Sequence, residues 1–303
     1  MTHNESTQAT AQDARCAIGG GTTLVGVIGW PVEHSLSPTM HNAAFAALGM
    51  DWVYVPLAVY PDHLAEAVRG LRALGFAGAN VTVPHKQAVL AHLEEVSHAA
   101  QVIGAVNTIV VRDGSLYGDN TDAAGFIAAL QEAGFYPAGS YCAVLGAGGA
   151  ARAVVYALAE AGALQVGIYN RSFAHARHLC QDMAKFYPHV RFEPASLSDV
   201  STIGEDTDLL VNATSVGMWP HTEVSPWPPE LPVPGHLSVC DLVYNPQETY
   251  FLTQARAVGA ETIEGLGMLV YQGAAAFQMW AGCAAPVEIM RAACTAALWE
   301  RHT

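Results

Sequence analysis

The short apolar run Tyr141-Cys-Ala-Val-Leu145 leads directly into the small residues Gly146-Ala147-Gly148-Gly149-Ala150. An apolar run of this length predicts a buried strand, and the glycines predict a tight turn before a helix. The spacing Gly-x-Gly-x-x-Ala is one form of the dinucleotide fingerprint, in which small residues let backbone N–H groups approach a pyrophosphate. Because a strand precedes the turn and a helix follows it, we expect a Rossmann-type domain that binds a dinucleotide.

The end of the next predicted strand indicates which dinucleotide this is. That strand covers residues 166–170 and ends in Asn170-Arg171-Ser172, about twenty residues after the turn. An NAD enzyme usually carries Asp or Glu at this point to hold the ribose 2′-hydroxyl, and a carboxylate would repel a 2′-phosphate. The chain has a cation here instead, so the sequence favours NADP over NAD as cofactor.

The alternation of strand and helix patterns predicts an α/β protein with more than one domain. Further apolar runs up to Gly265 extend the dinucleotide-binding unit, which we expect to cover residues 122–265. Residues 22–121 also alternate strands and helices, with a hairpin turning at Asp113-Gly114, so a separate α/β unit with a mostly parallel sheet is expected there. Residues 1–21 are polar and then glycine-rich, which is typical of a disordered tail rather than a signal peptide.

Three polar clusters follow short strand patterns between residues 80 and 122: Asn80-Val-Thr82-Val-Pro84-His85-Lys86, Asn107-Thr108 and Asn120-Thr121-Asp122. Strand ends normally project side chains toward a ligand site. Taken singly, such fragments are more often turn residues or solvated charges. Lys86, however, is one of only two lysines in the chain and therefore does not belong to a charged surface. We interpret Lys86 and Asp122 as acid–base residues among neutral groups that could hold a polyhydroxylated substrate.

Composition excludes several classes of partner. The formal net charge is −14, with 13 Lys and Arg against 27 Asp and Glu, so a nucleic acid or an anionic membrane is an unlikely partner. The six cysteines are scattered without metal-ligand spacing, and we expect no metal site and a reducing, cytoplasmic setting. No uninterrupted apolar run is long enough to span a bilayer. The sequence is compatible with either a monomer or a homodimer.

Taken together, these motifs resemble the shikimate dehydrogenase family. The resemblance extends over almost everything from Val27 to Gly282. It is carried by these segments: His34-Ser-Leu-Ser-Pro38, Asn80-Val-Thr-Val-Pro-His-Lys86, Gly104-Ala-Val-Asn-Thr108, Asn120-Thr-Asp122, Gly146-Ala-Gly-Gly-Ala150, Asn170-Arg171, Asn212-Ala-Thr-Ser-Val-Gly-Met218 and Met268-Leu-Val-Tyr-Gln-Gly273. It implies reversible, NADP-linked reduction of 3-dehydroshikimate to shikimate in aromatic amino-acid biosynthesis. It further implies that residues 266–303 return to the substrate-binding domain of residues 22–121, and that the active site lies in the cleft between this domain and the Rossmann-type domain.

The same resemblance implies roles for individual residues. Lys86 and Asp122 would form the catalytic pair, beside the hydroxyl that is oxidised. The substrate's carboxylate and ring hydroxyls would be bound by Ser35, Ser37, Asn80, Thr82, Asn107, Tyr244 and Gln272. The cofactor would be bound by Gly146, Ala147, Gly148, Gly149, Ala150, Asn170, Arg171, Ser172, His175, Thr214, Leu242 and Gly265.

Two points stay open at the level of sequence. In the family, the lysine at the position of Lys86 is usually regarded as the proton acceptor. A lysine must be neutral before it can accept a proton, whereas the nearby Asp122 carboxylate favours the charged ammonium. A helix beginning at Lys86 would act in the opposite sense through its positive end. On the cofactor side, Ser172 replaces the family's usual Thr and His175 stands where a second cation is expected, so NADP preference could be weaker or pH-dependent.

Three functions therefore remain in view. The first is a shikimate dehydrogenase that uses NADP. The second is a quinate or shikimate dehydrogenase that uses NAD or NADP, since one additional ring hydroxyl is a small difference to infer from sequence. The third is a non-catalytic relative that binds the metabolite as a sensor, against which the intact Lys86 and Asp122 and the intact glycine turn argue. The sequence gives no role for the Pro- and Trp-rich segment 219–235.

Overall fold

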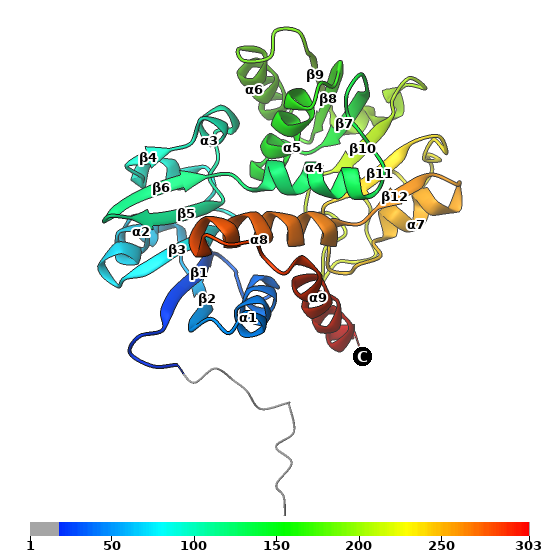
Figure 1. Ribbon diagram of the computed structural model, residues 1–303. Coiled ribbons are helices and arrows are strands. Elements are labelled where there is room, and N and C mark those ends of the chain that lie inside the picture. The colour runs from blue at the N-terminus through cyan, green and yellow to red at the C-terminus, as the bar shows by residue number, and fades with distance from the viewer. Residues whose placement is uncertain (1–17, 303) are drawn as a thin grey trace, which may run out of the picture.

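The computed structural model describes residues 18–302, and it contains two six-stranded sheets (Figure 1). Of the tail expected to be disordered, residues 1–17 lie outside the described residues. Residues 18–21 lead through a turn into β1, with Thr22 N donating to Gly19 O at 3.2 Å. Within the described residues no helix is both long and apolar enough to cross a lipid bilayer.

The first sheet is mixed and mostly parallel. Its strands lie in the order β2 (Trp52–Ala58), β1 (Thr23–Gly29), β3 (Phe76–Val81), β5 (Thr108–Arg112), β6 (Ser115–Asp119) and β4 (Glu95–Val96). The pairs β1–β2, β1–β3 and β4–β6 are parallel, whereas β3–β5 and β5–β6 are antiparallel. The predicted hairpin joins β5 to β6, and both of its turn residues have positive φ, 49° at Asp113 and 79° at Gly114. The connecting helices are α1 (Ser37–Ala47), η1 (Pro61–His63), α2 (Leu64–Ala73), η2 (Ala88–His92) and α3 (His98–Ile103).

The second sheet is entirely parallel and has the Rossmann strand order. Its strands follow one another as β9 (Arg191–Ser196), β8 (Gln165–Asn170), β7 (Tyr141–Leu145), β10 (Leu209–Asn212), β11 (Ser238–Asp241) and β12 (Glu261–Ile263). Its helices are α5 (Gly149–Glu160), α6 (Phe173–Ala184), η3 (Leu197–Thr202) and α7 (Tyr250–Ala257). The order reverses between β7 and β10, and a ligand site is expected outside the carboxyl ends of strands at such a point. The α/β fold predicted from the sequence is confirmed.

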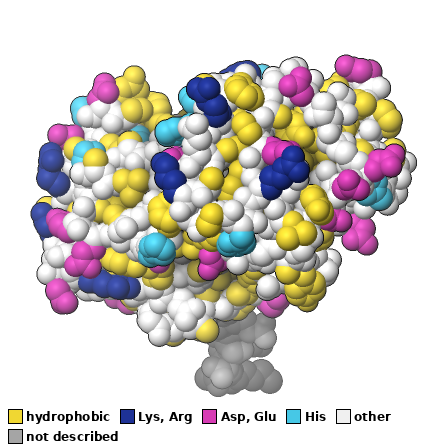
Figure 2. Space-filling view, turned by 90° about the horizontal axis from the view of Figure 1, so that it is seen from above, with side chains coloured by type: hydrophobic (Ala, Val, Ile, Leu, Met, Phe, Trp, Pro, Cys, Tyr) yellow, Lys and Arg dark blue, Asp and Glu magenta, His cyan; other side chains and the backbone are white. Residues whose placement is uncertain are grey.

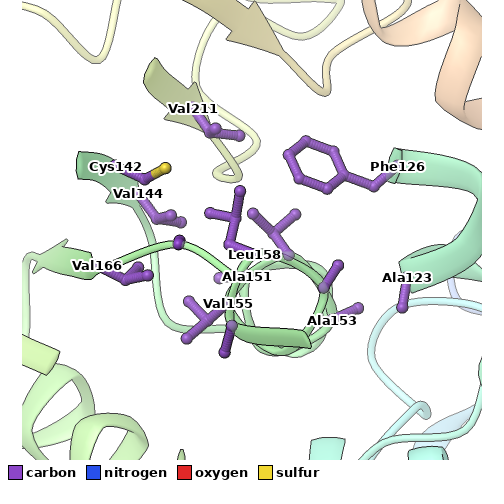
Figure 3. Close-up of a cluster of buried hydrophobic side chains, with 14 of the residues drawn as sticks. Ala123, Phe126, Cys142, Val144, Ala151, Ala153, Val155, Leu158, Val166 and Val211 are labelled. Carbon is purple, nitrogen blue, oxygen red and sulfur yellow. The ribbon is translucent and has the colours of Figure 1, made fainter. Parts of the chain in front are cut away.

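Both faces of the second sheet are covered, which explains why its strands read as continuous apolar runs. Cys142 and Val144 point toward α5, whose Ala151, Val155 and Leu158 fill one side of the sheet (Figure 3). The other side is covered by α7 and by the Pro- and Trp-rich segment 219–235, whose Trp227 and Val233 are buried in that core. Trp227 also donates from Nε1 to Leu231 O at 2.8 Å, so part of this segment acts as a cover for the sheet.

Two helices connect the two sheets, and the last helix of the chain packs on the first sheet. Helix α4 (Asp122–Glu132) leaves the first sheet and lies side by side with α8 (Gly265–Ala281), which returns from the second (Figure 1). Helix α9 (Val287–His302) packs against α1, and its Met290, Cys294 and Leu298 are buried with Val25 and Val27 of β1. The final helices therefore share the core of the first sheet. The close crossing of α4 and α8 holds the beginning of α4, where Asp122 lies, at the junction of the two units.

Candidate active site

Lys86 and Asp122 form an ion pair in this structure. Lys86 Nζ lies 2.5 Å from Asp122 Oδ2, and the two side chains are 15% and 6% exposed. Asp122 is the first residue of α4, whereas Lys86 lies in the turn after β3. The predicted helix beginning at Lys86 is wrong, because the turn is followed only by the five-residue 3₁₀ segment η2 (Ala88–His92) before Leu93 returns to extended backbone. The chain after Lys86 therefore does not give this ammonium the positive end of an α-helix.

Asn107 connects the ion pair to its neighbours. Its Nδ2 donates to Asp122 Oδ1 at 2.7 Å and lies 3.4 Å from Gln272 Oε1, while its Oδ1 accepts from Thr121 N at 2.7 Å. Asp122 N in turn donates to Asn120 Oδ1 at 3.1 Å. One oxygen of the carboxylate is thus bound by an amide and the other by the ammonium, so the orientation of Asp122 is fixed from two sides.

Two of the predicted substrate residues, Asn80 and Thr82, lie in β3 and directly after it, next to Asn107. Asn80 is 5% exposed, and its Nδ2 donates to Asn107 O and to Thr108 Oγ1, both at 3.1 Å. Its Oδ1 accepts from the hydroxyl of Tyr54 at 2.8 Å. Both donors of this amide therefore bind protein atoms and only an oxygen lone pair is left. Thr82 follows the strand, and its Cγ2 occupies the space beside Gly29, at the end of β1.

The two serines lie at the beginning of α1, where Ser37 N donates to Ser35 Oγ at 3.2 Å. Ser37 is buried and Ser35 is partly exposed. Tyr244 follows β11 of the second sheet but packs against the buried cluster of the first sheet, so it crosses between the two units. Gln272 on α8 is 8% exposed and donates from Nε2 to Leu269 O at 2.8 Å, which leaves its Oε1 directed toward Asn107. Of these residues, Gln272 thus reaches Asn107 beside the ion pair, and Tyr244 lies against the core of the first sheet.

The glycine turn, residues 146–150, lies next to Lys86. Gly146 has φ of +116°, and a side chain there would meet Ala213 O at 3.0 Å and Thr214 Cγ2 at 3.3 Å. A Cβ on Gly149 would lie 3.4 Å from both Cβ and Cδ of Lys86. The glycine turn and Lys86 therefore lie so close together that even a methyl group on Gly149 would contact the lysine side chain, although the two belong to different sheets. Of all the observations at the site, this one ties the nucleotide turn to the ion pair most directly.

The beginning of α5 is built to receive an anion. Gly148 precedes the helix in extended conformation, and the first α-helical bond is from Arg152 N to Gly148 O at 2.9 Å. The N–H groups of the first helical turn have no partner inside a helix, and they carry the positive end of its dipole. Ala147, Gly149 and Ala150 add no bulky side chain there. The turn therefore fits a pyrophosphate.

The residues predicted to bind the 2′-phosphate lie at the end of β8 and directly after it. Asn170 Nδ2 donates to Ser172 O at 3.0 Å, which holds the loop that presents Arg171. Arg171 and His175 are both exposed. Between residues 18 and 302, the structure records no hydrogen bond or ion pair of the Arg171 guanidinium, which is therefore available to an incoming anion.

Asp241, at the end of β11, lies at the centre of the remaining residues that the sequence predicts to bind the cofactor. It is fully buried, accepts from Asn212 Nδ2 at 2.8 Å and from Thr249 Oγ1 at 2.7 Å, and burial raises its pKa to about 6. Asn212 Oδ1 accepts from the backbone and the hydroxyl of Thr214. Leu242 N donates to Asn212 O, and a Cβ on Gly265 would lie 2.6 Å from Leu242 O. Leu242 is therefore held by Asn212, and Gly265 packs closely against Leu242.

Comparison with known proteins gives three family matches in chain order. The shikimate dehydrogenase substrate binding domain matches residues 27–109, shikimate/quinate 5-dehydrogenase matches residues 132–218, and the shikimate 5′-dehydrogenase C-terminal domain matches residues 265–295. The chain is also 51% identical over 274 residues to a shikimate dehydrogenase (NADP(+)) of Moorella thermoacetica, covering 90% of this chain and 92% of that protein. The chain belongs to the shikimate dehydrogenase family.

Solved structures agree with this membership. Shikimate 5-dehydrogenase of Thermus thermophilus, in complex with NADP(H) and shikimate, is 40% identical with a TM-score of 0.82, and the match covers 91% of this chain and all of that one. Quinate dehydrogenase of Corynebacterium glutamicum, in complex with NAD, is 32% identical with a TM-score of 0.82, over 90% and 98% of the two chains. The shared shikimate dehydrogenase fold is therefore compatible with more than one substrate and cofactor.

Two residues that hold the predicted site residues in place were not identified from the sequence. Tyr54 donates to Asn80 from inside β2, and Asp241, at the end of β11, binds Asn212, which in turn holds Thr214. Tyr54 stands in an apolar strand pattern, where a tyrosine is usually core, and only its alternation with Val53 and Val55 on the opposite face could have marked it. Asp241 carried a better signal, since a carboxylate that ends an apolar strand rarely lies there without a partner.

Proposed function

We propose that this protein catalyses the reversible NADPH-dependent reduction of 3-dehydroshikimate to shikimate in aromatic amino-acid biosynthesis. The proposal is carried by the position of Lys86, whose side chain would lie 3.4 Å from a Cβ placed on Gly149 of the nucleotide turn and whose Nζ lies 2.5 Å from Asp122 Oδ2. It supports a site where one carbonyl or alcohol is reached by an acid–base pair on one side and a nicotinamide on the other. Family membership supports the substrate class.

Lys86 and Asp122 manage the proton in this proposal. NADP, when bound, supplies or receives the hydride. In the reducing direction the Lys86 ammonium donates a proton to the oxygen that develops negative charge, and the Asp122 carboxylate keeps the ammonium in place. In the oxidising direction the pair accepts the hydroxyl proton. Because the two groups are coupled at 2.5 Å, the proton belongs to the pair rather than to either residue.

The other polar residues hold the substrate. Ser35, Ser37 and Tyr244 bind its carboxylate, and Thr82, Asn107 and Gln272 bind its ring hydroxyls, with Asn80 contributing its remaining lone pair. The Asn107 amide is already shared between Asp122 and Gln272, so it links substrate binding to the acid–base pair. All of these residues except Tyr244 lie at or after the strands of the first sheet, at the beginning of α1 or on α8, which supports assigning residues 22–121 and 266–303 to a substrate-binding domain.

The cofactor is held by residues 122–265 as a Rossmann-type domain. The backbone of Gly146, Ala147, Gly148, Gly149 and Ala150 cradles the pyrophosphate, and Thr214, Leu242 and Gly265 line the nicotinamide side. Arg171 binds the 2′-phosphate, with Asn170, Ser172 and His175 around it. The free cysteines at 142, 180, 240, 283 and 294 support a reducing, cytoplasmic setting.

One assay distinguishes this function from its rivals. Initial rates are measured with shikimate and quinate, each with NADP⁺ and NAD⁺. We expect the highest kcat/KM with shikimate and NADP⁺. A higher kcat/KM with quinate, or with NAD⁺, would favour the quinate or dual-specificity enzyme. Binding of shikimate without turnover under any of the four conditions would identify a non-catalytic sensor and overturn the proposal.

A further inference from the structure

Helix α5 carries one arginine among small apolar residues. Arg152 is the fourth residue of the helix, three positions after Gly149, and lies between Ala151 and Ala153. Its side chain is only 11% exposed. A guanidinium is strongly disfavoured away from water unless its donors find partners, and an apolar residue would fill the same space at lower cost. The contacts of Arg152 therefore need an explanation beyond packing.

Arg152 joins three helices. Its Nε donates to the carbonyl of Ile103, the last residue of α3, and its Nη2 lies 3.0 Å from Asp182 Oδ2 on α6. Burial by itself raises the pKa of Asp182, but hydrogen bonds from Lys185 and Arg152 outweigh it and the pKa is lowered. Gly104 has φ of +70°, and a Cβ there would lie 2.9 Å from Arg152 Nη2, so the guanidinium sits directly against the turn after α3.

The segment after Ile103 leads straight to the ion pair. Ala105 O accepts from Asn120 Nδ2 at 2.9 Å, and Asn120 also holds the backbone of Asp122. Val106 N donates to Lys86 O at 2.7 Å. Asn107 then donates its side-chain amide to Asp122. Residues 103–107, which begin at the carbonyl that Arg152 holds, thus contact Lys86 once and Asp122 once, and they reach Asp122 a second time indirectly through Asn120.

We infer that Arg152 is a positioning residue for the reaction: from the helix of the nucleotide turn, it fixes residues 103–107 and thereby the placement of Asn107 against Asp122 and Lys86. This inference rests on the function proposed above. The bond to a backbone carbonyl has a defined direction, which an apolar residue could not supply, and the Asp182 carboxylate holds the guanidinium in the required orientation. A cofactor seated at the beginning of α5 and the acid–base pair are thereby held in one rigid frame.

The test is a double-mutant cycle of Arg152→Met with Asn107→Ala, measured as kcat for shikimate oxidation with NADP⁺ at saturating substrates. Lys185→Met is the matched control, because Lys185 binds the other oxygen of Asp182 at 3.0 Å and does not touch Ile103. We expect Arg152→Met to lower kcat at least tenfold in the wild-type background but less than threefold in the Asn107→Ala background. Lys185→Met should leave kcat within twofold of wild type.

A purely structural role gives a different pattern. In that case Arg152→Met lowers the melting temperature, while its effect on kcat is absent or is the same with and without Asn107, and either result overturns the inference. Should Arg152→Met fail to fold, Arg152→Lys carries the same cycle, because a lysine can still pair with Asp182 but cannot bind both partners. An inactive wild-type protein would instead contradict the proposed function, so the two failures are distinguishable.

Discussion

His41 on α1 is a buried histidine with unusual surroundings. It is 0% exposed, and its ring stacks on Tyr54 with centroids 4.4 Å apart and an interplanar angle of 1°. Within residues 18–302, neither ring nitrogen finds a hydrogen-bond partner. Burial lowers the pKa of His41 from 6.5 to about 3, since a charged ring would lose its hydration. The folded protein therefore keeps this imidazole neutral at physiological pH.

This residue should make stability depend on pH. In the unfolded chain His41 takes up a proton below pH 6.5, whereas in the folded chain it resists protonation until about pH 3, so stability falls as pH decreases through this window. For His41 alone, the expected loss between pH 7 and pH 5 is about 2 kcal/mol. Urea denaturation of wild type and His41→Leu at both pH values measures it, and the variant should lose correspondingly less.

The comparison with a variant is necessary because Asp241 acts in the opposite sense. Its raised pKa stabilises the folded protein below pH 3.8, and this contribution is lost as pH rises through about 6. Asp241 is present in both proteins and cancels from their difference. His63→Leu, which removes an exposed histidine, should behave like wild type. Equal pH dependence of wild type and His41→Leu would contradict this account of His41.

At the scale of elements, the crossing of α4 and α8 depends on a missing side chain. A Cβ on Gly125 of α4 would lie 2.6 Å from Gln272 N and 2.7 Å from Gln272 Cβ. Gly125→Ala should therefore push the helices apart and cost about 1–3 kcal/mol of unfolding free energy. Because Gln272 approaches Asn107, we also expect kcat/KM for shikimate to fall. Chemical denaturation and initial-rate measurements check both effects.

A second glycine supplies the matched control. Gly70 lies within α2, where a Cβ would meet no atom within 4 Å. Alanine loses less conformational freedom than glycine on entering a helix, so Gly70→Ala should stabilise the protein by about 0.5–1 kcal/mol and leave activity unchanged. If Gly125→Ala were as well tolerated as Gly70→Ala, the close approach of α4 and α8 would not be a constraint on the site.

Elements with a strong local pattern could be predicted from the sequence. The strand and turn at 141–150 and the hairpin at Asp113-Gly114 follow from residue types that act within a few positions. The segment after Lys86 could not be predicted in the same way. Pro84 and the apolar residues that follow it are compatible with an α-helix, but the chain must reach β4 within a few residues, and this tertiary requirement leaves only η2.

In the candidate site, too, some residues could be identified from the sequence and others only from the fold. Lys86 and Asp122 stand out in the sequence because charges at strand ends are few in a chain with only 13% charged residues. Their partners could not be paired without the fold, since Asn107 and Gln272 are separated by 165 positions. Tyr54 and Arg152 lie within apolar patterns that read as core, and only the packing of separate elements reveals what their polar atoms bind.

At the scale of the whole molecule, a net charge of −14 opposes the binding of an anionic cofactor. On the face shown in Figure 2, lysine and arginine side chains are scattered singly among acidic and apolar ones, without a continuous basic patch. Selection of a 2′-phosphate therefore depends on local cations. We expect Arg171→Ala to lower the ratio of kcat/KM for NADP⁺ over NAD⁺ by about tenfold or more.

Arg177→Ala controls for net charge, because Arg177 is an exposed arginine on the same helix as His175. It should leave the cofactor ratio within about twofold of wild type, since an exposed charge that makes no direct bond to the phosphate is screened by salt. Equal losses in Arg171→Ala and Arg177→Ala would mean that the field of the molecule, rather than a specific contact, selects the cofactor.

In the function proposed above, Lys86 and Asp122, brought together at the junction of the two sheets, perform proton transfer beside the nucleotide turn. The most direct test is kcat for shikimate oxidation with NADP⁺ in Lys86→Met and Asp122→Asn, with Lys185→Met, which removes the only other lysine, as control. We predict that both site variants lose about 10²-fold or more while remaining folded and binding NADP⁺, and that the control stays within twofold of wild type. Turnover at the wild-type rate in both site variants would contradict the account.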